Sequence, residues 1–96
     1  MTVVGKNLLV EFGRKHADAR SAISAWTAEA EAASWKASQD IKTRFSSASF
    51  IGEGRVVFNI KGNHYRLDAQ IDYATQVVLV RRIGTHAEYT RWTFDE

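Results

Sequence analysis

The sequence predicts an α+β domain of two layers, in which N-terminal helices pack on one face of a small antiparallel β-sheet. Its 96 residues, 45% of them hydrophobic, suffice for one core, so we expect residues 1–96 to form a single domain. Apolar residues follow helical spacing up to about residue 46 and alternate with period two after it. Helices followed by antiparallel strands favour a sheet whose second face stays open.

Two helices are expected in the first third of the chain. Leu8, Leu9 and Phe12 lie at positions i, i+1 and i+4 of the first helix. The second helix is rich in alanine, and Asp18 is its expected N-cap. Its apolar stripe consists of Ala22, Ile23, Trp26, Ala30 and Ala33.

Two shorter elements are expected on either side of this helical pair. Thr2–Val4 could add a short strand at the start of the chain. Ser38 is expected to cap a short helix that reaches about Phe45, with Asp40 placed near the positive end of that helix.

The second half of the chain predicts an antiparallel meander. Val56, Phe58 and Ile60 alternate in one strand, and residues 61–63 turn the chain because glycine and asparagine tolerate positive φ. A later strand, Gln76 to Ile83, has the composition of a central strand and is expected to end at Gly84. Between them, the returning strand carries Tyr65, Leu67, Ala69, Ile71 and Tyr73 on one face and His64, Arg66, Asp68, Gln70 and Asp72 on the other.

Composition excludes several classes of function. The chain has no cysteine, which rules out disulfide scaffolds, thiolate metal sites and a cysteine nucleophile. No apolar run approaches the roughly 20 residues of a membrane span, and the N-terminus lacks the apolar segment of a secretory signal. We therefore expect a cytoplasmic protein that binds no membrane. The three histidines lack zinc-ligand spacing, and the common nucleotide-binding and serine-hydrolase motifs are absent.

The polar face of the sheet has two interpretations. Charged residues on an antiparallel sheet most often keep that face in water. Alternatively, Arg66 and His64, with Lys61 in the adjoining turn, could bind an anion. His86 and Tyr89 support the second interpretation, because at positions i and i+3 they would share one side of a helical turn. Histidine transfers protons near neutral pH and arginine binds phosphate at two points, a combination that suits phosphodiester chemistry.

Two segments of this region resemble a known family. The run FNIKGNHYRL at Phe58–Leu67 and the run THAEY at Thr85–Tyr89 resemble the HigB-type toxins of bacterial toxin–antitoxin systems, within the wider RelE/ParE superfamily. Trp35–Lys36, Asp40–Lys42 and Ser47–Phe50 occur in the family's usual order as well. The resemblance therefore covers nearly the whole chain, and its specificity rests on the order of these motifs.

The resemblance implies a RelE-like fold, with helices on one side of the sheet and RNA on the other. It implies an mRNA interferase, an endoribonuclease that cuts translated messages on the ribosome without a metal or another cofactor. The ribose 2′-OH would attack the adjacent phosphate, leaving a cyclic phosphate and a free 5′-OH. A HigA antitoxin with a helix-turn-helix domain would be the protein partner, and the toxin would reach operator DNA only through it.

The resemblance also assigns roles to individual residues. Arg66 matches the family's arginine in the second hairpin strand and would neutralise charge on the scissile phosphate. The alternative is an exposed arginine paired with Asp68 or Asp72. His86 and Tyr89 match the terminal motif, where one would accept the 2′-OH proton and the other would protonate the leaving oxygen or stack on a base. Which residue takes which role stays open.

Further RNA contacts are expected around these three residues. Asn63 matches the turn motif, although it could serve the geometry of the turn alone. Arg81 and Arg82 are neighbours in a strand, so only one of them should face the RNA. Trp92 could stack on a base or pack in the core. The complete set of expected RNA-binding residues is Lys61, Asn63, His64, Arg81, Arg82 and Trp92.

Two other functions stay open. The chain lacks the clustered lysines and arginines that many RelE relatives place around the active face, so proton transfer would depend more on His86 and Tyr89. ParE-like members of the superfamily poison DNA gyrase by binding and cut nothing. A third interpretation is a nontoxic relative that retains only antitoxin binding.

Overall fold

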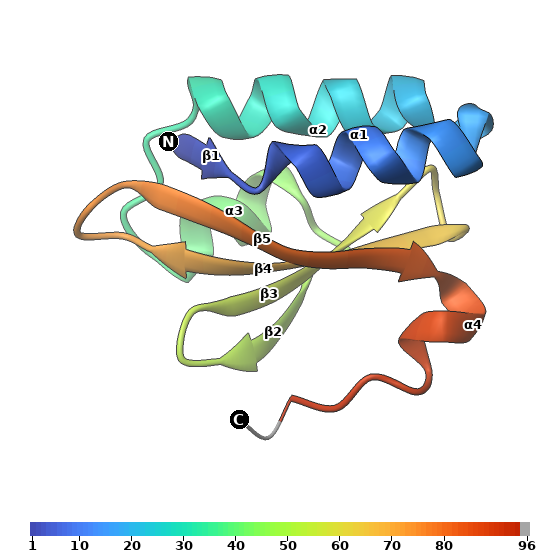
Figure 1. The fold of residues 1–96 in the computed structure, drawn as a ribbon. Helices are drawn as coiled ribbons and strands as arrows, with labels where there is room; N and C mark the ends of the chain where they lie inside the picture. Colours follow the sequence, from blue (N-terminus) through green and yellow to red (C-terminus); the bar gives the residue numbers. More distant parts are fainter. Residues whose placement is uncertain (95–96) are drawn as a thin grey trace.

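The structure is a computed structural model that describes residues 1–94. Helices and strands are largely grouped along the chain, in an α+β arrangement drawn in Figure 1. In chain order the elements are β1 (Thr2–Val4), α1 (Lys6–Lys15), the 3₁₀ helix η1 (Ala17–Ala19), α2 (Arg20–Ala32), α3 (Ser38–Arg44), β2 (Ser49–Gly52), β3 (Arg55–Ile60), β4 (Tyr65–Asp72), β5 (Val77–Thr85) and α4 (His86–Tyr89).

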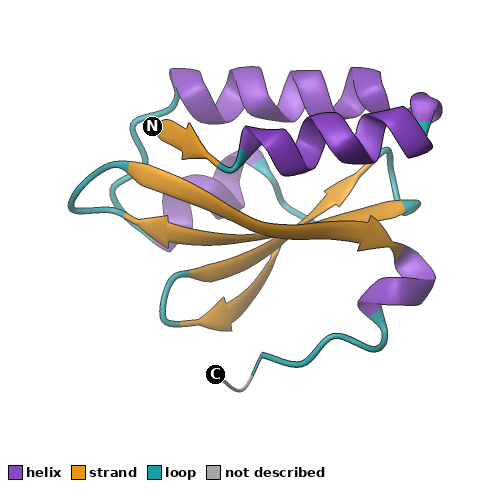
Figure 2. Cartoon of the chain, viewed as in Figure 1, coloured by secondary structure: helices purple, strands orange, loops and turns teal. Residues whose placement is uncertain are grey.

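The strands of residues 1–94 form one mixed sheet in the order β1-β5-β4-β3-β2, shown in Figure 2. Strands β3 to β5 pair as the predicted antiparallel meander, and β2, which was not predicted, adds a further antiparallel strand beside β3. Strand β1 pairs parallel with β5. The predicted α+β fold is confirmed, and β5 lies inside the sheet as its composition predicted. The expected end of this strand at Gly84 is wrong, because β5 continues to Thr85 and Gly84 pairs with Arg66.

Helices α1 and α2 lie side by side over one face of the sheet (Figure 1). Gly5 makes the connection from β1 to α1 possible, because its φ of 93° is one that other residues rarely adopt. A Cβ atom at this position would also lie 2.9 Å from the carbonyl oxygen of Val80, so only glycine lets α1 start against β5. No helix within residues 1–94 has both the length and the apolarity that crossing a membrane requires.

The two predicted helix caps are wrong. Helix α2 begins after Ala19 without a side-chain cap, and the Asp18 carboxylate instead accepts hydrogen bonds from Tyr65 and Lys61. Ser38 is the first residue of α3 and not its cap. Asp40 does lie in the first turn of α3, as expected, where its side chain accepts a hydrogen bond from a backbone N–H just before the helix.

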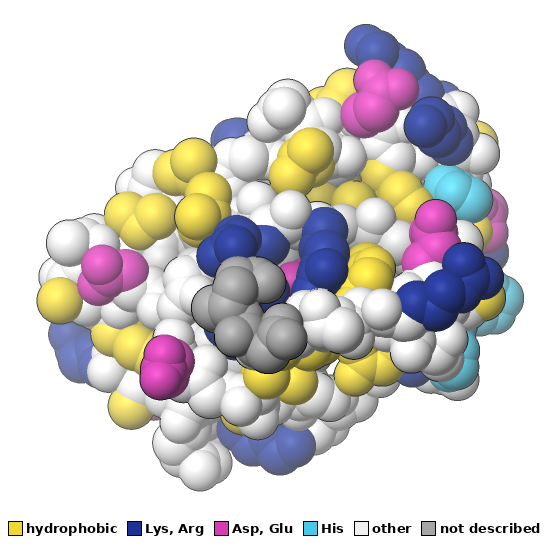
Figure 3. Space-filling model, turned by 60° about the horizontal axis from the view of Figure 1, so that its bottom comes forward, with side chains coloured by type: hydrophobic (Ala, Val, Ile, Leu, Met, Phe, Trp, Pro, Cys, Tyr) yellow, Lys and Arg dark blue, Asp and Glu magenta, His cyan; other side chains and the backbone are white. Residues whose placement is uncertain are grey.

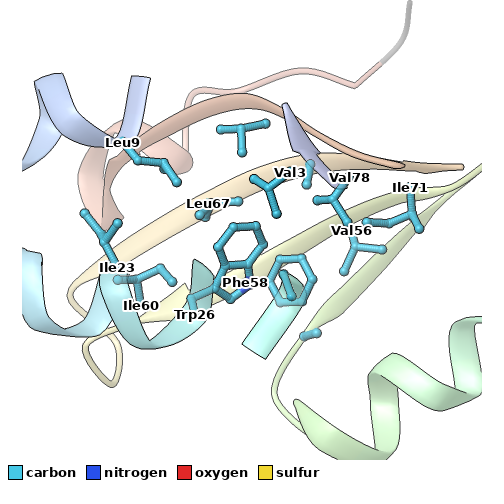
Figure 4. Packing of buried hydrophobic residues seen from close by; sticks show 14 of the residues in the cluster. Val3, Leu9, Ile23, Trp26, Val56, Phe58, Ile60, Leu67, Ile71 and Val78 are labelled. Atoms are coloured by element: carbon cyan, nitrogen blue, oxygen red, sulfur yellow. The ribbon is translucent and has the colours of Figure 1, made fainter. Parts of the chain in front are cut away.

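Aromatic rings form the middle of the core between the helices and the sheet. Phe58 of β3 is completely buried, and its ring centroid lies 5.3 Å from that of Trp26 and 6.3 Å from that of Trp35. Figure 4 shows aliphatic side chains from α1, α2 and the strands around this centre. The apolar face predicted for the returning strand is confirmed for Tyr65, Leu67, Ala69 and Ile71, which are all buried. Tyr73 lies just beyond the end of β4 and is partly buried against the same core.

The opposite face of the sheet is not left open as predicted. After α4, residues 90–94 run back beneath the sheet, on the side away from α1 and α2 (Figure 1). Arg66 is only 8% exposed and Asp68 is completely buried, although both were expected on a face in water. This cover could not be predicted from the residue pattern, because residues 90–94 have no apolar period of their own. We call this side of the sheet, with residues 90–94, the lower face.

Candidate functional site

Arg66 is held in a fixed position on the lower face. Its Nη1 donates to the backbone oxygen of Asn63 at 3.0 Å, and its Nη2 donates to the side-chain oxygen of the same residue at 2.6 Å. A third bond runs from Nη1 to the Tyr65 carbonyl. Within residues 1–94, no carboxylate pairs with this guanidinium and no hydrogen bond uses its Nε. The described structure therefore does not contain the alternative ion pair between Arg66 and Asp68 or Asp72.

The short helix α4 holds Tyr89 over this arginine. The Tyr89 ring centroid lies 5.2 Å from Cζ of Arg66, a cation–π contact. Thr85 and Glu88 fix the helix through a capping box, in which each side chain accepts a hydrogen bond from the other residue's backbone N–H, at 3.1 and 2.8 Å. The helical turn expected around His86 and Tyr89 is thus confirmed, and His86 is exposed at its start.

The hairpin turn after β3 lies next to α4. Lys61 and Gly62 adopt φ of 53° and 63°, so these two residues, and not Asn63, take the positive φ of the turn. Asn63 instead holds Arg66, a role that turn geometry alone does not require. The backbone N–H of His86 donates to the carbonyl oxygen of His64 at 3.1 Å, which brings the two exposed histidines to one corner of the protein.

Lys61 is tied to the helical layer at this corner. Its Nζ lies 2.9 Å from Oδ2 of Asp18, and the Tyr65 hydroxyl donates to the same carboxylate at 2.7 and 2.9 Å. The hydrogen bond from Tyr65, followed by that from Lys61, lowers the pKa of Asp18, and the same carboxylate raises the pKa of Tyr65. Both side chains of the Lys61–Asp18 pair are about half exposed, so Lys61 remains accessible to a ligand.

A buried ionic cluster lies beside Arg66 on the lower face. The Asp68 carboxylate accepts from Arg55 Nε and Nη2 at 3.2 and 2.6 Å, and from Arg82 Nε at 2.8 Å. Among the described residues, two guanidinium groups therefore surround this one carboxylate. Arg55 and Asp68 were not among the predicted site residues. Alternation placed Asp68 on this face, but the pairing of residues across strands also depends on the register, which alternation within one strand does not determine.

A β-bulge decides which of the two neighbouring arginines faces the cluster. Asp68 pairs with Arg82 and Ala69 pairs with Val80, so Arg81 is the extra residue between them. Val80 faces the core, and the bulge turns Arg82 to the lower face two residues later. Arg81 lies exposed at the bulge, and the expectation that only one of the two arginines faces this side stays a prediction.

Aromatic residues of the C-terminal segment cover the cluster. Cζ of Arg82 lies 4.5 Å from the Trp92 ring centroid and 5.0 Å from that of Phe94, and Phe94 also covers Arg55. Gly84 leaves the room that Trp92 needs, since a Cβ there would lie 2.9 Å from the indole ring. Trp92 thus packs on the lower face and not in the core between helices and sheet. Phe94 was missed at the sequence level.

The lower face combines basic, aromatic and imidazole groups. Figure 3 shows Lys and Arg side chains near its centre and histidines along one edge. Within residues 1–94, no group of three or more His, Cys, Asp or Glu could hold a metal ion. The arrangement offers a fixed cation at Arg66 for an anionic ligand, with His86, His64 and Tyr89 near it as groups that can transfer a proton or contact a base.

The chain matches one family model. Residues 19–92 match the HigB toxin model, described as a RelE-like toxic component of a toxin–antitoxin system. The matched range contains β2 to β5 and α4, and with them every residue of the candidate site except Asp18 and Phe94. Among curated proteins, none is similar enough to match this chain.

Proposed function

The chain belongs to the HigB family of RelE-like toxins, and on that premise we propose that it is a metal-independent endoribonuclease that cuts mRNA. As a member of a toxin–antitoxin family it has an antitoxin partner. The finer parts of the proposal are a HigA-type antitoxin with a helix-turn-helix domain, contact with operator DNA only through that antitoxin, action in the cytoplasm, and cleavage of translated messages on the ribosome.

The observation that supports this proposal most strongly is the pattern of hydrogen bonds around the buried Arg66 guanidinium. Asn63 occupies the Nη1–Nη2 edge of the guanidinium, while its Nε–Nη2 edge has an unused donor at each nitrogen within the described residues. A buried cation without a counter-charge is costly, and an incoming phosphate would remove that cost. This edge matches the two-point geometry of an arginine–phosphate contact.

The proposed reaction needs no group beyond those of the RNA and the chain. The 2′ oxygen loses its proton to a base and attacks the adjacent phosphorus, and the bond from phosphorus to the 5′ oxygen breaks. The 5′ oxygen takes a proton from an acid, which leaves a 2′,3′-cyclic phosphate and a free 5′-OH. His86 and Tyr89 serve as the acid–base pair, in either order. Arg66 stabilises the additional negative charge that develops on the phosphate oxygens.

The remaining predicted contacts surround this centre. Lys61 and His64 in the turn, and Arg82 and Arg81 along β5, would bind neighbouring phosphates. Asn63 would act by orienting Arg66. Trp92 makes an edge contact with Tyr89, with ring centroids 5.6 Å apart, and is proposed to offer a stacking surface for a base.

The test is to induce the protein in growing cells and to map new RNA 5′ ends across the transcriptome. We expect codon-phased cuts within translated messages. Arg66→Ala, Arg66→Lys and His86→Ala should each reduce cleavage. For Arg66→Ala the expected reduction is about 10²–10³-fold, because the variant removes the group that stabilises charge in the transition state. Arg44→Ala is the matched control, because Arg44 lies on α3 and pairs with Glu29 of α2, and this variant should cut like the unsubstituted chain.

Two outcomes would contradict the proposal. Unchanged cleavage by folded Arg66→Ala and His86→Ala proteins would remove these residues from the site. Growth arrest with intact mRNA and a DNA-damage response would instead indicate gyrase poisoning. Thermal unfolding of each variant separates loss of chemistry from loss of the fold.

A further inference from the structure

The two edge strands of the sheet, β1 and β2, differ in what surrounds them (Figure 1). Next to β1, helix α2 packs against the strand, and the amino group of Met1 donates to the carbonyl oxygens of Glu31 and Ala33. Strand β2 pairs with β3 on one side, and within residues 1–94 no backbone hydrogen bond outside this pairing involves Ser49–Gly52. The outer side of β2 therefore presents N–H and C=O groups that can pair with another strand.

The residues of β2 do not prevent such pairing. Charged side chains and proline often protect the edge strand of a sheet, and β2 contains neither. All four of its residues are exposed, and two of them are large and apolar, Phe50 at 37% and Ile51 at 41% exposed. An edge with apolar side chains and unpaired backbone groups favours association with a further strand.

Charges of opposite sign stand at the two ends of β2. Lys42 lies at its beginning, where its Nζ donates to the carbonyl oxygens of Ser46 and Ala48 at 2.7 and 3.4 Å. The same Nζ lies 5.9 Å from the centroid of the Phe50 ring. Glu53 directly follows the last residue of β2, and both Lys42 and Glu53 are exposed. In an antiparallel pair of β2 strands, the basic end of each strand would lie beside the acidic end of the other.

We propose that a second copy of this chain pairs with the first through β2, antiparallel and around a two-fold axis perpendicular to the sheet. A contact of this symmetry requires a surface that is complementary to itself, and the opposite charges at the ends of β2 meet that requirement. Pairing centred on Phe50 brings Ala48 of one copy close to Gly52 of the other, and thus Lys42 close to Glu53, at both ends.

The two sheets become one continuous sheet in this dimer. A two-fold axis perpendicular to the sheet keeps both lower faces on the same side, so the surface around each Arg66 is not covered by the other copy. The helices of both copies lie together on the opposite side. The proposal therefore depends neither on RNA cleavage nor on the antitoxin.

The contact is small, and we expect a weak dimer. Strand β2 has only four residues, and its pairing with β3 is irregular between Phe50 and Gly52, which shortens the regular stretch. Each exposed Lys42–Glu53 ion pair contributes little by itself. The dissociation constant should therefore lie in the micromolar range, at the weak end of specific interfaces.

The experiment measures association of the purified chain by sedimentation velocity over a range of protein concentrations. Ile51→Lys places a charge on the proposed interface and should weaken dimerisation by roughly tenfold or more. Val4→Lys is the matched control, because Val4 is 45% exposed but belongs to β1, the other edge strand. This variant should dimerise like the unsubstituted chain. Thermal unfolding establishes that each variant is folded.

Charge reversal tests the proposed orientation of the two strands. Lys42→Glu and Glu53→Lys should each weaken the dimer by roughly tenfold, because each places like charges together at both ends of the pair. The double variant Lys42→Glu/Glu53→Lys restores opposite charges and should regain most of the affinity. Raising the salt concentration should weaken the unsubstituted dimer and strengthen the dimers of the two single variants.

Hydrogen exchange at low and high protein concentration locates the contact without any variant. We expect added protection of backbone amides in residues 48–53 at high concentration and none in β1. The proposal would be overturned by a chain that stays monomeric at every concentration, by folded Ile51→Lys that dimerises normally, by loss of the dimer in Val4→Lys, or by a double charge variant that regains no affinity. Protection of β2 only when the antitoxin is added would also overturn it, because the occupant of this edge would then be the antitoxin.

Discussion

The side chains buried between the helices and the sheet are apolar, whereas on the lower face of the same sheet Arg55, Arg66 and Asp68 are buried. The first side is stabilised by removing apolar surface from water, a force without direction. The second depends on the placement of a few charged groups under two aromatic rings. The two faces of one sheet therefore have different roles: the face under the helices stabilises the fold, and the lower face holds charges in fixed positions for a ligand.

The largest effect should come from the apolar side. Phe58→Ala removes a completely buried ring that contacts Trp26, Trp35 and Phe45. We expect a loss of about 4 kcal/mol in the free energy of unfolding, because the cavity cannot close among three other rings. Urea unfolding followed by tryptophan fluorescence measures it. A loss below about 1 kcal/mol would mean that the aromatic cluster is not the centre of stability.

The next largest effect tests the charged side. Asp68→Asn leaves two guanidinium groups facing a neutral amide, and we expect a loss of about 3 kcal/mol in the free energy of unfolding. This lies at the low end of the usual range, because the Arg82 side chain is 34% exposed. The same urea titration measures it, with Asp72→Asn on the exposed end of β4 as the control.

A control as destabilised as Asp68→Asn would show that any carboxylate on β4 matters equally. The contrast between the two faces of the sheet also predicts that Phe58→Ala lowers the stability without altering the hydrogen bonds around Arg66. Asp68→Asn should instead disturb the cover formed by Trp92, visible as a change in its near-ultraviolet circular dichroism. Identical spectral changes in both variants would break the distinction between the two sides.

The apolar side was predictable because periodicity carries the information. Alternation placed Tyr65, Leu67, Ala69 and Ile71 on one face, and helical spacing placed Ile23 and Trp26 on one stripe, with no knowledge of long-range contacts needed. The same alternation assigned Arg66 and Asp68 correctly to the other face. The i, i+3 spacing of His86 and Tyr89 suggested the helical turn of α4, whose capping residues Thr85 and Glu88 are local in sequence.

The lower face was only half predictable because its structure depends on contacts between distant segments. The bulge at Arg81 changes the face to which the Arg82 side chain points, and an arginine at either position does not predict a bulge. Residues 90–94 cover Asp68 only because the chain folds back after α4. Asn63 was expected to serve the turn or the RNA, and its bonds to Arg66 depend on where the turn places it. The roles proposed for Arg66, His86 and Tyr89 stay predictions until cleavage is measured.

The smallest effect is expected where the two sides meet, at Asp18. This carboxylate comes from the helical layer and accepts hydrogen bonds from Tyr65 and Lys61 of the sheet, which lower its pKa below 3.8. A lowered pKa means that the folded state favours the carboxylate, so its stabilising contribution is present above pH 3.8 and disappears as the pH falls through the folded-state pKa. Asp18→Asn should therefore be slightly less stable than the unsubstituted chain at neutral pH and equal to it in acid.

Thermal unfolding midpoints of both proteins between pH 7 and about pH 2 measure this difference. The change at neutral pH should be small, because Asp18 and Lys61 are about half exposed and water screens the pair. Tyr65 gives an independent check, since the Asp18 carboxylate raises its pKa above 10.0 and its absorbance titration should shift to lower pH in Asp18→Asn. A stability difference that does not vary with pH, or a Tyr65 titration that does not move, would show that this corner is held by packing of Tyr65 against Phe12 and His16 and not by the carboxylate.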